Sequence, residues 1–239
     1  IRGSVTPMKI RLMLLPVLVC ACAIFASSAN AQDTTGYTYF VHGAPGRDLS
    51  PAFNPALPVD VSLNGACIVK DWTFGEIRGP YSFPAGVYDA KVSLANSQNP
   101  CGNATVFEVP LTVYQGLASF AVAAISPTNT LTGYLFTADL TPIATGNARV
   151  FVANASAVSS ITAGFGPAAL DFINDGAAAF AVAPAGTYDG SIYMAGSTTP
   201  LVGPISETIE SQSATGFFVV GSATSGSLQI LRFSIKNVF

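Results

Sequence analysis

Apolar and polar residues alternate along this chain in short runs, and no window shows sustained helical periodicity. In the run 59–63, Val59, Val61 and Leu63 point to one side of an extended chain, and the two polar residues between them point to the other. Similar runs, rich in β-branched and aromatic residues and bounded by Gly, Pro or Asn, occupy 37–41, 87–94, 106–113, 118–124 and 133–137. The pattern predicts short β-strands that each bury one face.

The sequence after the first 31 residues contains two similar copies of one pattern. The segment 83–90 (FPAGVYDA) returns as 183–190 (APAGTYDG), and 39–44, 59–65 and 131–138 align with 150–155, 170–176 and 228–235. The offset between copies falls from 111 to 100 before the Pro-Ala-Gly turn. This alignment predicts an 11-residue insertion in the first copy, between Gly65 and Pro84. A repeat that keeps the order of its elements indicates duplication of a whole domain.

Short strands at regular spacing must pack their apolar faces against a second sheet. The sequence therefore predicts an all-β protein of two tandem immunoglobulin-like antiparallel β-sandwich domains after a cleaved signal peptide. The predicted boundaries are 1–31 for upstream residues and leader, 32–145 for the first domain and 146–239 for the second. Each domain then has about 100 residues, near the common domain size.

The first 31 residues have the layout of a secretory signal peptide. Lys9 and Arg11 follow Met8, an apolar stretch covers 12–25, and 29–31 read Ala-Asn-Ala. The apolar stretch is shorter than the roughly 20 residues of a membrane span. The expected location is the periplasm or the cell exterior, with no membrane span in the mature chain.

Loss of the leader removes three of the ten basic residues and none of the 13 acidic ones, so the mature net charge is −6. An acidic surface without a Lys/Arg run disfavours nucleic-acid binding. Cys67 and Cys101 are the mature cysteines. An oxidising compartment favours a disulfide between them, with two free thiols as the alternative. A single histidine and two cysteines do not supply a four-ligand zinc site, so no metal or cofactor is expected.

The chain resembles the DUF4397 family of exported bacterial domains. The resemblance rests on 41–45 (VHGAP), 59–65 (VDVSLNG), 83–88 (FPAGVY) and 111–116 (LTVYQG), and on 170–172, 183–188 and 208–209 in the second copy. The second copy replaces the histidine turn with 153–156 (ANAS). What the resemblance implies is an immunoglobulin-like sandwich and export. It implies no catalytic residues.

Candidate catalytic groups are few. His42 is the only histidine and histidine is a common general base, but the second copy has Ala153 or Asn154 in its place. A turn residue that bonds the backbone is the favoured interpretation. Asp60 with Asp171, and Asp89 with Asp189, are predicted to be equivalent single carboxylates on solvated faces or in turns. We therefore expect a protein that is not an enzyme.

The Pro-Ala-Gly-x-Tyr turns are expected to be structural. Tyr88 and Tyr188 should pack their rings and bond their hydroxyls to the backbone, as in a tyrosine corner. The residues that form these two structural motifs are Pro84, Gly86, Tyr88, Pro184, Gly186 and Tyr188.

The predicted insertion is the candidate binding site. It holds Lys70, Trp72, Phe74 and Arg78, and Trp and Arg are enriched at binding hot spots. The alternative is that Trp72 fills the core of the first domain. The leading hypothesis is an envelope binding module that presents loop 66–83 to a protein or glycan. The second is a self-associating structural component that uses uncharged sheet edges. A hydrolase using His42 is a distant third.

Overall fold

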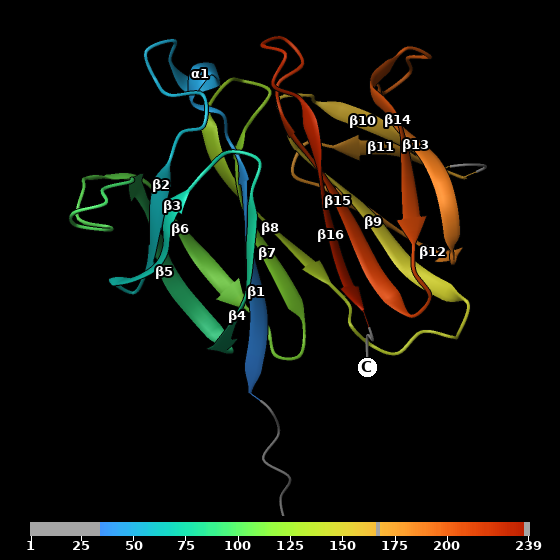
Figure 1. Cartoon of the computed structure of the whole chain (residues 1–239), viewed down its shortest axis with the longest axis horizontal. Coiled ribbons are helices and arrows are strands. Elements are labelled where there is room, and N and C mark those ends of the chain that lie inside the picture. The colour runs from blue at the N-terminus through green and yellow to red at the C-terminus, as the bar shows by residue number, and fades with distance from the viewer. Residues whose placement is uncertain (1–33, 166–167, 237–239) are drawn as a thin grey trace, which may run out of the picture. The chain divides into compact units, whose positions relative to one another are not determined.

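The computed structural model describes residues 34–165 and 168–236, which form sixteen strands and one short helix. The strands of the first half, blue to green in Figure 1, are β1 (Thr35–Gly43), β2 (Val59–Leu63), β3 (Ala66–Trp72), β4 (Ile77–Pro84), β5 (Gly86–Leu94), β6 (Thr105–Val113), β7 (Ala118–Ile125) and β8 (Leu131–Ala138). The helix α1 (Gly46–Leu49) lies between β1 and β2.

The second half repeats this set in yellow to red. Its strands are β9 (Asn147–Ser156), β10 (Ser160–Phe165), β11 (Ala168–Asn174), β12 (Ala178–Pro184), β13 (Gly186–Met194), β14 (Pro200–Ile209), β15 (Ser213–Gly221) and β16 (Gln229–Lys236). Each half builds two four-stranded sheets. The orders are β4-β1-β7-β8 and β3-β2-β5-β6 in the first, and β12-β9-β15-β16 and β11-β10-β13-β14 in the second. The predicted tandem β-sandwiches are confirmed.

One pairing in each half differs from the antiparallel prediction. β1 runs parallel to β7, and β9 runs parallel to β15, while the other ten strand pairs are antiparallel among the described residues. Parallel neighbours need a long crossover. Here that crossover is the whole set of strands between the first and the seventh of each half.

The described residues form three apolar cores. One lies within the first sandwich around Phe40, Val61 and Trp72, and another within the second around Ile161 and Phe217. The third lies between sheet β4-β1-β7-β8 and sheet β12-β9-β15-β16, where Phe120 packs against Phe151 and Phe218 with ring centroids 5.6 and 5.1 Å apart. Both sandwiches belong to the same compact unit.

This third core changes the burial of the central strands. β15 is buried at every position, and β9 at eight of its ten. The expectation that each strand buries one face is therefore wrong for the sheets that meet at the centre. Strands buried on both faces read as near-continuous apolar runs, as 214–220 (ATGFFVV) does.

The position of the insertion is also a correction. The connector from β1 to β2 spans residues 44–58, whereas the connector from β9 to β10 spans only 157–159. The β3–β4 and β11–β12 connectors have nearly the same length, residues 73–76 and 175–177. The extra segment of the first half is thus 44–58, which carries α1, and not the stretch between Gly65 and Pro84.

The sheet order shows why the alignment of 59–65 with 170–176 is wrong. β2 pairs with β3 and β5, and β10 pairs with β11 and β13, so the counterpart of β2 is β10 and not the run at 170–176. Asp60 and Asp171 are therefore not equivalent. Asp60 lies on β2, whereas Asp171 lies on β11, where its side chain is exposed as expected.

Candidate functional site

The predicted binding stretch 66–83 is mostly strand and not loop. It forms β3, a four-residue connector and most of β4, and these two strands belong to opposite sheets of the first sandwich. Its side chains are accordingly divided between the core and the surface.

Trp72 lies in the core. Its side chain is 1% exposed and its ring packs against Phe40 and His42, with centroids 6.1 and 4.8 Å away. The indole Nε1–H donates to the carbonyl of Glu76 at 3.2 Å. Of the two interpretations of this residue, the structure shows the core one.

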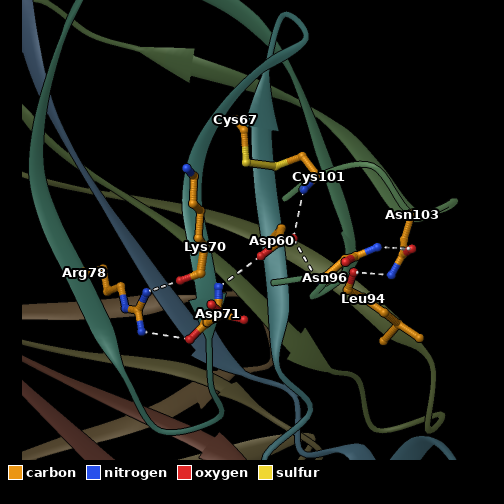
Figure 2. The surroundings of a disulfide bond; sticks show 9 residues. All are labelled: Asp60, Cys67, Lys70, Asp71, Arg78, Leu94, Asn96, Cys101 and Asn103. Atoms are coloured by element: carbon orange, nitrogen blue, oxygen red, sulfur yellow. Dashed lines mark hydrogen bonds between the residues drawn. A yellow bond between two sulfur atoms is a disulfide. The ribbon is translucent and has the colours of Figure 1, made fainter. Parts of the chain in front are cut away.

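The other predicted binding residues hold the β3–β4 connector together or lie apart from it. Arg78 donates to the backbone carbonyls of Lys70 and Asp71 (Figure 2). It also donates to the carboxylate of Glu76, 2.7 Å away. Phe74 packs against the third core, which lies between the two sandwiches. The Lys70 side chain is exposed. The structure does not gather these four side chains on one surface.

The disulfide between Cys67 and Cys101 is confirmed. It ties β3 to the segment 95–104, which covers the outer face of β2 (Figure 2). Under this segment lies Asp60, which is 1% exposed. Its carboxylate accepts three backbone N–H bonds, from Asp71 at 2.9 Å, Asn96 at 3.2 Å and Cys101 at 2.8 Å.

Asp60 was expected on a solvated face or as a turn cap, and the solvated face is wrong. A buried carboxylate is tolerated when its oxygens are hydrogen-bonded, and here the backbone donors supply those bonds. Asp89 is exposed and lies 3.2 Å from the Lys91 ammonium. Asp189 is exposed as well.

Both predicted tyrosine motifs have the same geometry. The Tyr88 hydroxyl donates to the Pro84 carbonyl at 2.8 Å, and the Tyr188 hydroxyl donates to the Pro184 carbonyl at 2.8 Å. Each ring thus closes the turn that begins β5 or β13, because the strands start at Gly86 and Gly186.

His42 is buried, and its side chain hydrogen-bonds to the backbone. It is 1% exposed, and its Nε2 lies 2.9 Å from the Leu57 carbonyl oxygen. Burial lowers the pKa of His42 to about 4, and neither the Leu57 carbonyl nor the charge of Glu76 offsets that effect. The ring is therefore neutral near pH 7, and its Nε2–H donates to Leu57.

A polar pocket that the sequence did not indicate lies where loops from both halves meet. It has a volume of about 350 Å³ and is lined by Arg47, Asp48, Pro127, Asn129, Ala157, Ser222, Thr224 and Ser225. These residues come from α1, from the β7–β8 and β15–β16 turns, and from the connector between β9 and β10. In Figure 1 these segments lie at one end of the strands.

Two hydrogen bonds to Asp48 order the pocket, one from the second half and one from within the first half. The Ser227 hydroxyl donates to the Asp48 carboxylate at 2.7 Å, and the Asn129 amide donates to the Asp48 carbonyl at 3.0 Å. Asp48 is 8% exposed, and its other carboxylate oxygen, Oδ1, has no hydrogen-bond partner among the described residues. Small-ligand sites are usually preformed, and a few placed polar groups orient the ligand in them.

Arg47 adds an unpaired cation to the pocket. Within 34–165 and 168–236, every Lys and Arg side chain except Arg47 and Lys70 has a salt-bridge partner. A guanidinium is a planar fork of donors that suits carboxylates and phosphates. The sequence offered one signal for this site, the extra length of the first copy, and the alignment placed that length in the wrong connector.

In the described part of the chain, no group of His, Cys, Asp and Glu side chains is arranged to hold a metal ion. Nor do those residues include a helix that is both long and apolar enough to cross a membrane.

The fold and this pocket define a two-sandwich protein with a loop-built polar site. The model of a family described as Domain of unknown function (DUF4397) matches residues 36–162, just over half of the chain. The chain therefore belongs to the DUF4397 family. The match covers the first sandwich and continues into β9 and β10.

Two further comparisons concern curated proteins and solved structures. No curated protein matches the sequence. A solved structure described as the Bacillus anthracis TIE protein is 12% identical, with 79% of this chain covered and a TM-score of 0.23. This chain spans 33% of the length of that one.

Proposed function

We propose that the protein is an exported, non-enzymatic binding module of the bacterial envelope that holds a hydroxyl-rich ligand, a glycan residue, in the pocket between Arg47 and Thr224. The observation that carries the proposal is the pocket itself, whose lining combines hydroxyls, an amide, a carboxylate and an unpaired guanidinium. Sugar hydroxyls both donate and accept, so they match such a mixed lining.

Size and preorganisation support this function. The volume of about 350 Å³ falls in the range of small-molecule sites, which begins near roughly 300 Å³. Because the bond from Ser227 to Asp48 already fixes the loops, little ordering accompanies binding. Loops carried on a rigid scaffold are also the usual place for binding residues.

Export and duplication of the family domain are part of the proposal. The disulfide favours an oxidising compartment. The same order of eight strands in each half, and the shared tyrosine–proline bond, support a second DUF4397 copy in 146–239.

The test is binding of the purified protein to an array of neutral and uronic-acid oligosaccharides, followed by affinity measurements on the best ligand. Arg47→Gln should weaken binding about tenfold or more, because a hydrogen bond to a charged group contributes about 1.5–3 kcal/mol. Lys70→Gln is the matched control, since Lys70 is the other unpaired cation, and it should change the affinity less than about twofold.

Two outcomes would contradict the proposal. One is an array without a ligand. The other is a ligand lost in Lys70→Gln and kept in Arg47→Gln, which would return the site to the β3–β4 region.

A further inference from the structure

The sheets of the described chain end in eight edge strands, β3, β4, β6, β8, β11, β12, β14 and β16. Exposed edges are usually protected by charges, prolines or bulges. Six of these strands carry such a device. β3, β6, β11 and β16 hold charged residues, and β4 and β14 hold a proline within the strand together with a charge and a shift of register.

β8 and β12 hold no charge and pair with their neighbours without a register shift. β8 is flanked by β6, since a Cβ added at Gly133 would lie 2.8 Å from the Phe107 ring. β12 has the sequence AAFAVAP, and its one proline is the last residue. Its side chains Phe180 and Val182 are 58% and 64% exposed.

The hydrogen-bond register fixes which backbone groups of β12 are free. Asn154 N–H donates to the Ala177 carbonyl, and Ala185 N–H donates to the Gly146 carbonyl, so the odd-numbered residues of β12 bond to the β9 side. In an antiparallel pair the alternate residues then point their N–H and C=O groups away from that neighbour. The free groups at the outer edge therefore belong to Ala178, Phe180 and Val182.

β4, the matching edge strand of the first half, does not have this unprotected apolar edge. Ser82 of β4 is the counterpart of Val182 of β12. Ser82 lies opposite Tyr37 of β1, and Val182 lies opposite Arg149, which is the counterpart of Tyr37 on β9. Near the position of Phe180, β4 has Pro80, beside a bulge. The apolar, unprotected edge is therefore specific to the second half.

We propose that β12 pairs antiparallel with β12 of a second copy of this chain, about a two-fold axis at Ala181. Ala181 is the midpoint of the strand, so this register overlaps all seven residues. It places Phe180 opposite Val182 of the second copy, and both residues point their free backbone groups at each other. Each of the two exposed apolar side chains then gains an apolar cross-strand neighbour.

Charge favours a second copy as the occupant. A two-fold pairing sets each strand against itself, so a charged edge such as β16, with Arg232 and Lys236, brings like charges together. β12 carries no charge and meets no such repulsion. The face that holds Phe180 also lines a groove of about 430 Å³, where Leu117 and Ala138 offer apolar surface and where Arg149, opposite Val182, is neutralised by Asp139.

The test is sedimentation velocity of the processed chain over a wide concentration range, with three variants. Val182→Lys places two like charges near the axis, and Val182→Pro removes a free N–H while leaving the bonds to β9. Val87→Lys is the matched control, because Val87 is 67% exposed on β5, an interior strand of its sheet. All variants are checked for folding by their thermal transitions.

We expect the wild type to dimerise reversibly, and both Val182 variants to raise the dimer dissociation constant about tenfold or more. Val87→Lys should leave it within about twofold. A wild type that stays monomeric at every concentration overturns the proposal. So does a dimer that survives both Val182 variants, or one weakened equally by Val87→Lys. Because Arg47 lies outside β12, loss of dimerisation and loss of glycan binding are separate results.

Discussion

His42 on β1 and Asn154 on β9 hold matching positions in the two sandwiches. The N–H of each residue donates to the carbonyl just before the strand that pairs with its own, His42 to Glu76 before β4 and Asn154 to Ala177 before β12. Each side chain also meets a carbonyl two residues before the following strand, Leu57 before β2 and Val158 before β10. A histidine and an asparagine thus satisfy the same buried acceptor, although the connector they close is much longer in the first half.

The neutrality of His42 predicts a pH dependence of stability. In the unfolded chain the pKa is near 6.5 and in the folded protein about 4, so between these values the unfolded state binds a proton that the folded state does not. The contribution of the neutral ring to the free energy of unfolding is therefore fully present above pH 6.5. It falls as the pH drops toward 4, by up to about 3 kcal/mol.

Urea unfolding at pH 7 and pH 4.5 measures this loss. We expect the free energy of unfolding to fall by about 2–3 kcal/mol more in the wild type than in His42→Gln, which has no titrating ring. The comparison removes the contribution of the carboxylates that both proteins share. Equal losses in the two proteins would show that the histidine is not held neutral.

Asp60 should be essential for the order of the segment 95–104. Asp60→Asn replaces one acceptor oxygen with a donor that faces backbone N–H groups, and we expect a loss of about 2–3 kcal/mol. Asp89→Asn is the control, because it disturbs an exposed ion pair and should change stability by less than about 1 kcal/mol. Chemical denaturation of both variants at pH 7 gives the answer, and similar losses would refute the role given to Asp60.

The disulfide should contribute through the chain it closes. Cys67 and Cys101 are 34 residues apart, and the chain-entropy model assigns such a loop roughly 3–4 kcal/mol. A double variant, Cys67→Ser with Cys101→Ser, should unfold at a correspondingly lower urea concentration than the oxidised wild type. An unchanged midpoint would mean that Asp60 alone holds the covering segment.

Trp72→Ala should destabilise the first sandwich by about 3–5 kcal/mol, the range for a large aromatic in a core. Trp72 is the only tryptophan of the chain, so the emission of the wild type should be that of a buried indole and should shift to longer wavelength on unfolding. Phe172→Ala, at a side chain that is 71% exposed, is the control and should change stability by about 0.5 kcal/mol or less. A stable Trp72→Ala protein that loses only a binding partner would restore the hot-spot interpretation.

The sequence by itself determined the strand content, the two similar halves, the cysteine pair and the Pro-Ala-Gly-Tyr turns. These depend on local signals, since alternation, turn residues and a repeated motif are written in consecutive positions. The same local patterns gave the family resemblance, whose segments in the first half lie within the matched range 36–162.

Only the tertiary structure decided which faces are buried, which half carries the extra segment and where the polar pocket lies. Asp60 looked solvated because alternation does not reveal that the segment 95–104 covers its strand. Trp72 and Arg78 looked like one surface although one lies in the core and the other braces a connector. The pocket joins Arg47 to Thr224, residues separated by most of the chain, and no local pattern encodes a contact between two sandwiches that meet only when both have folded.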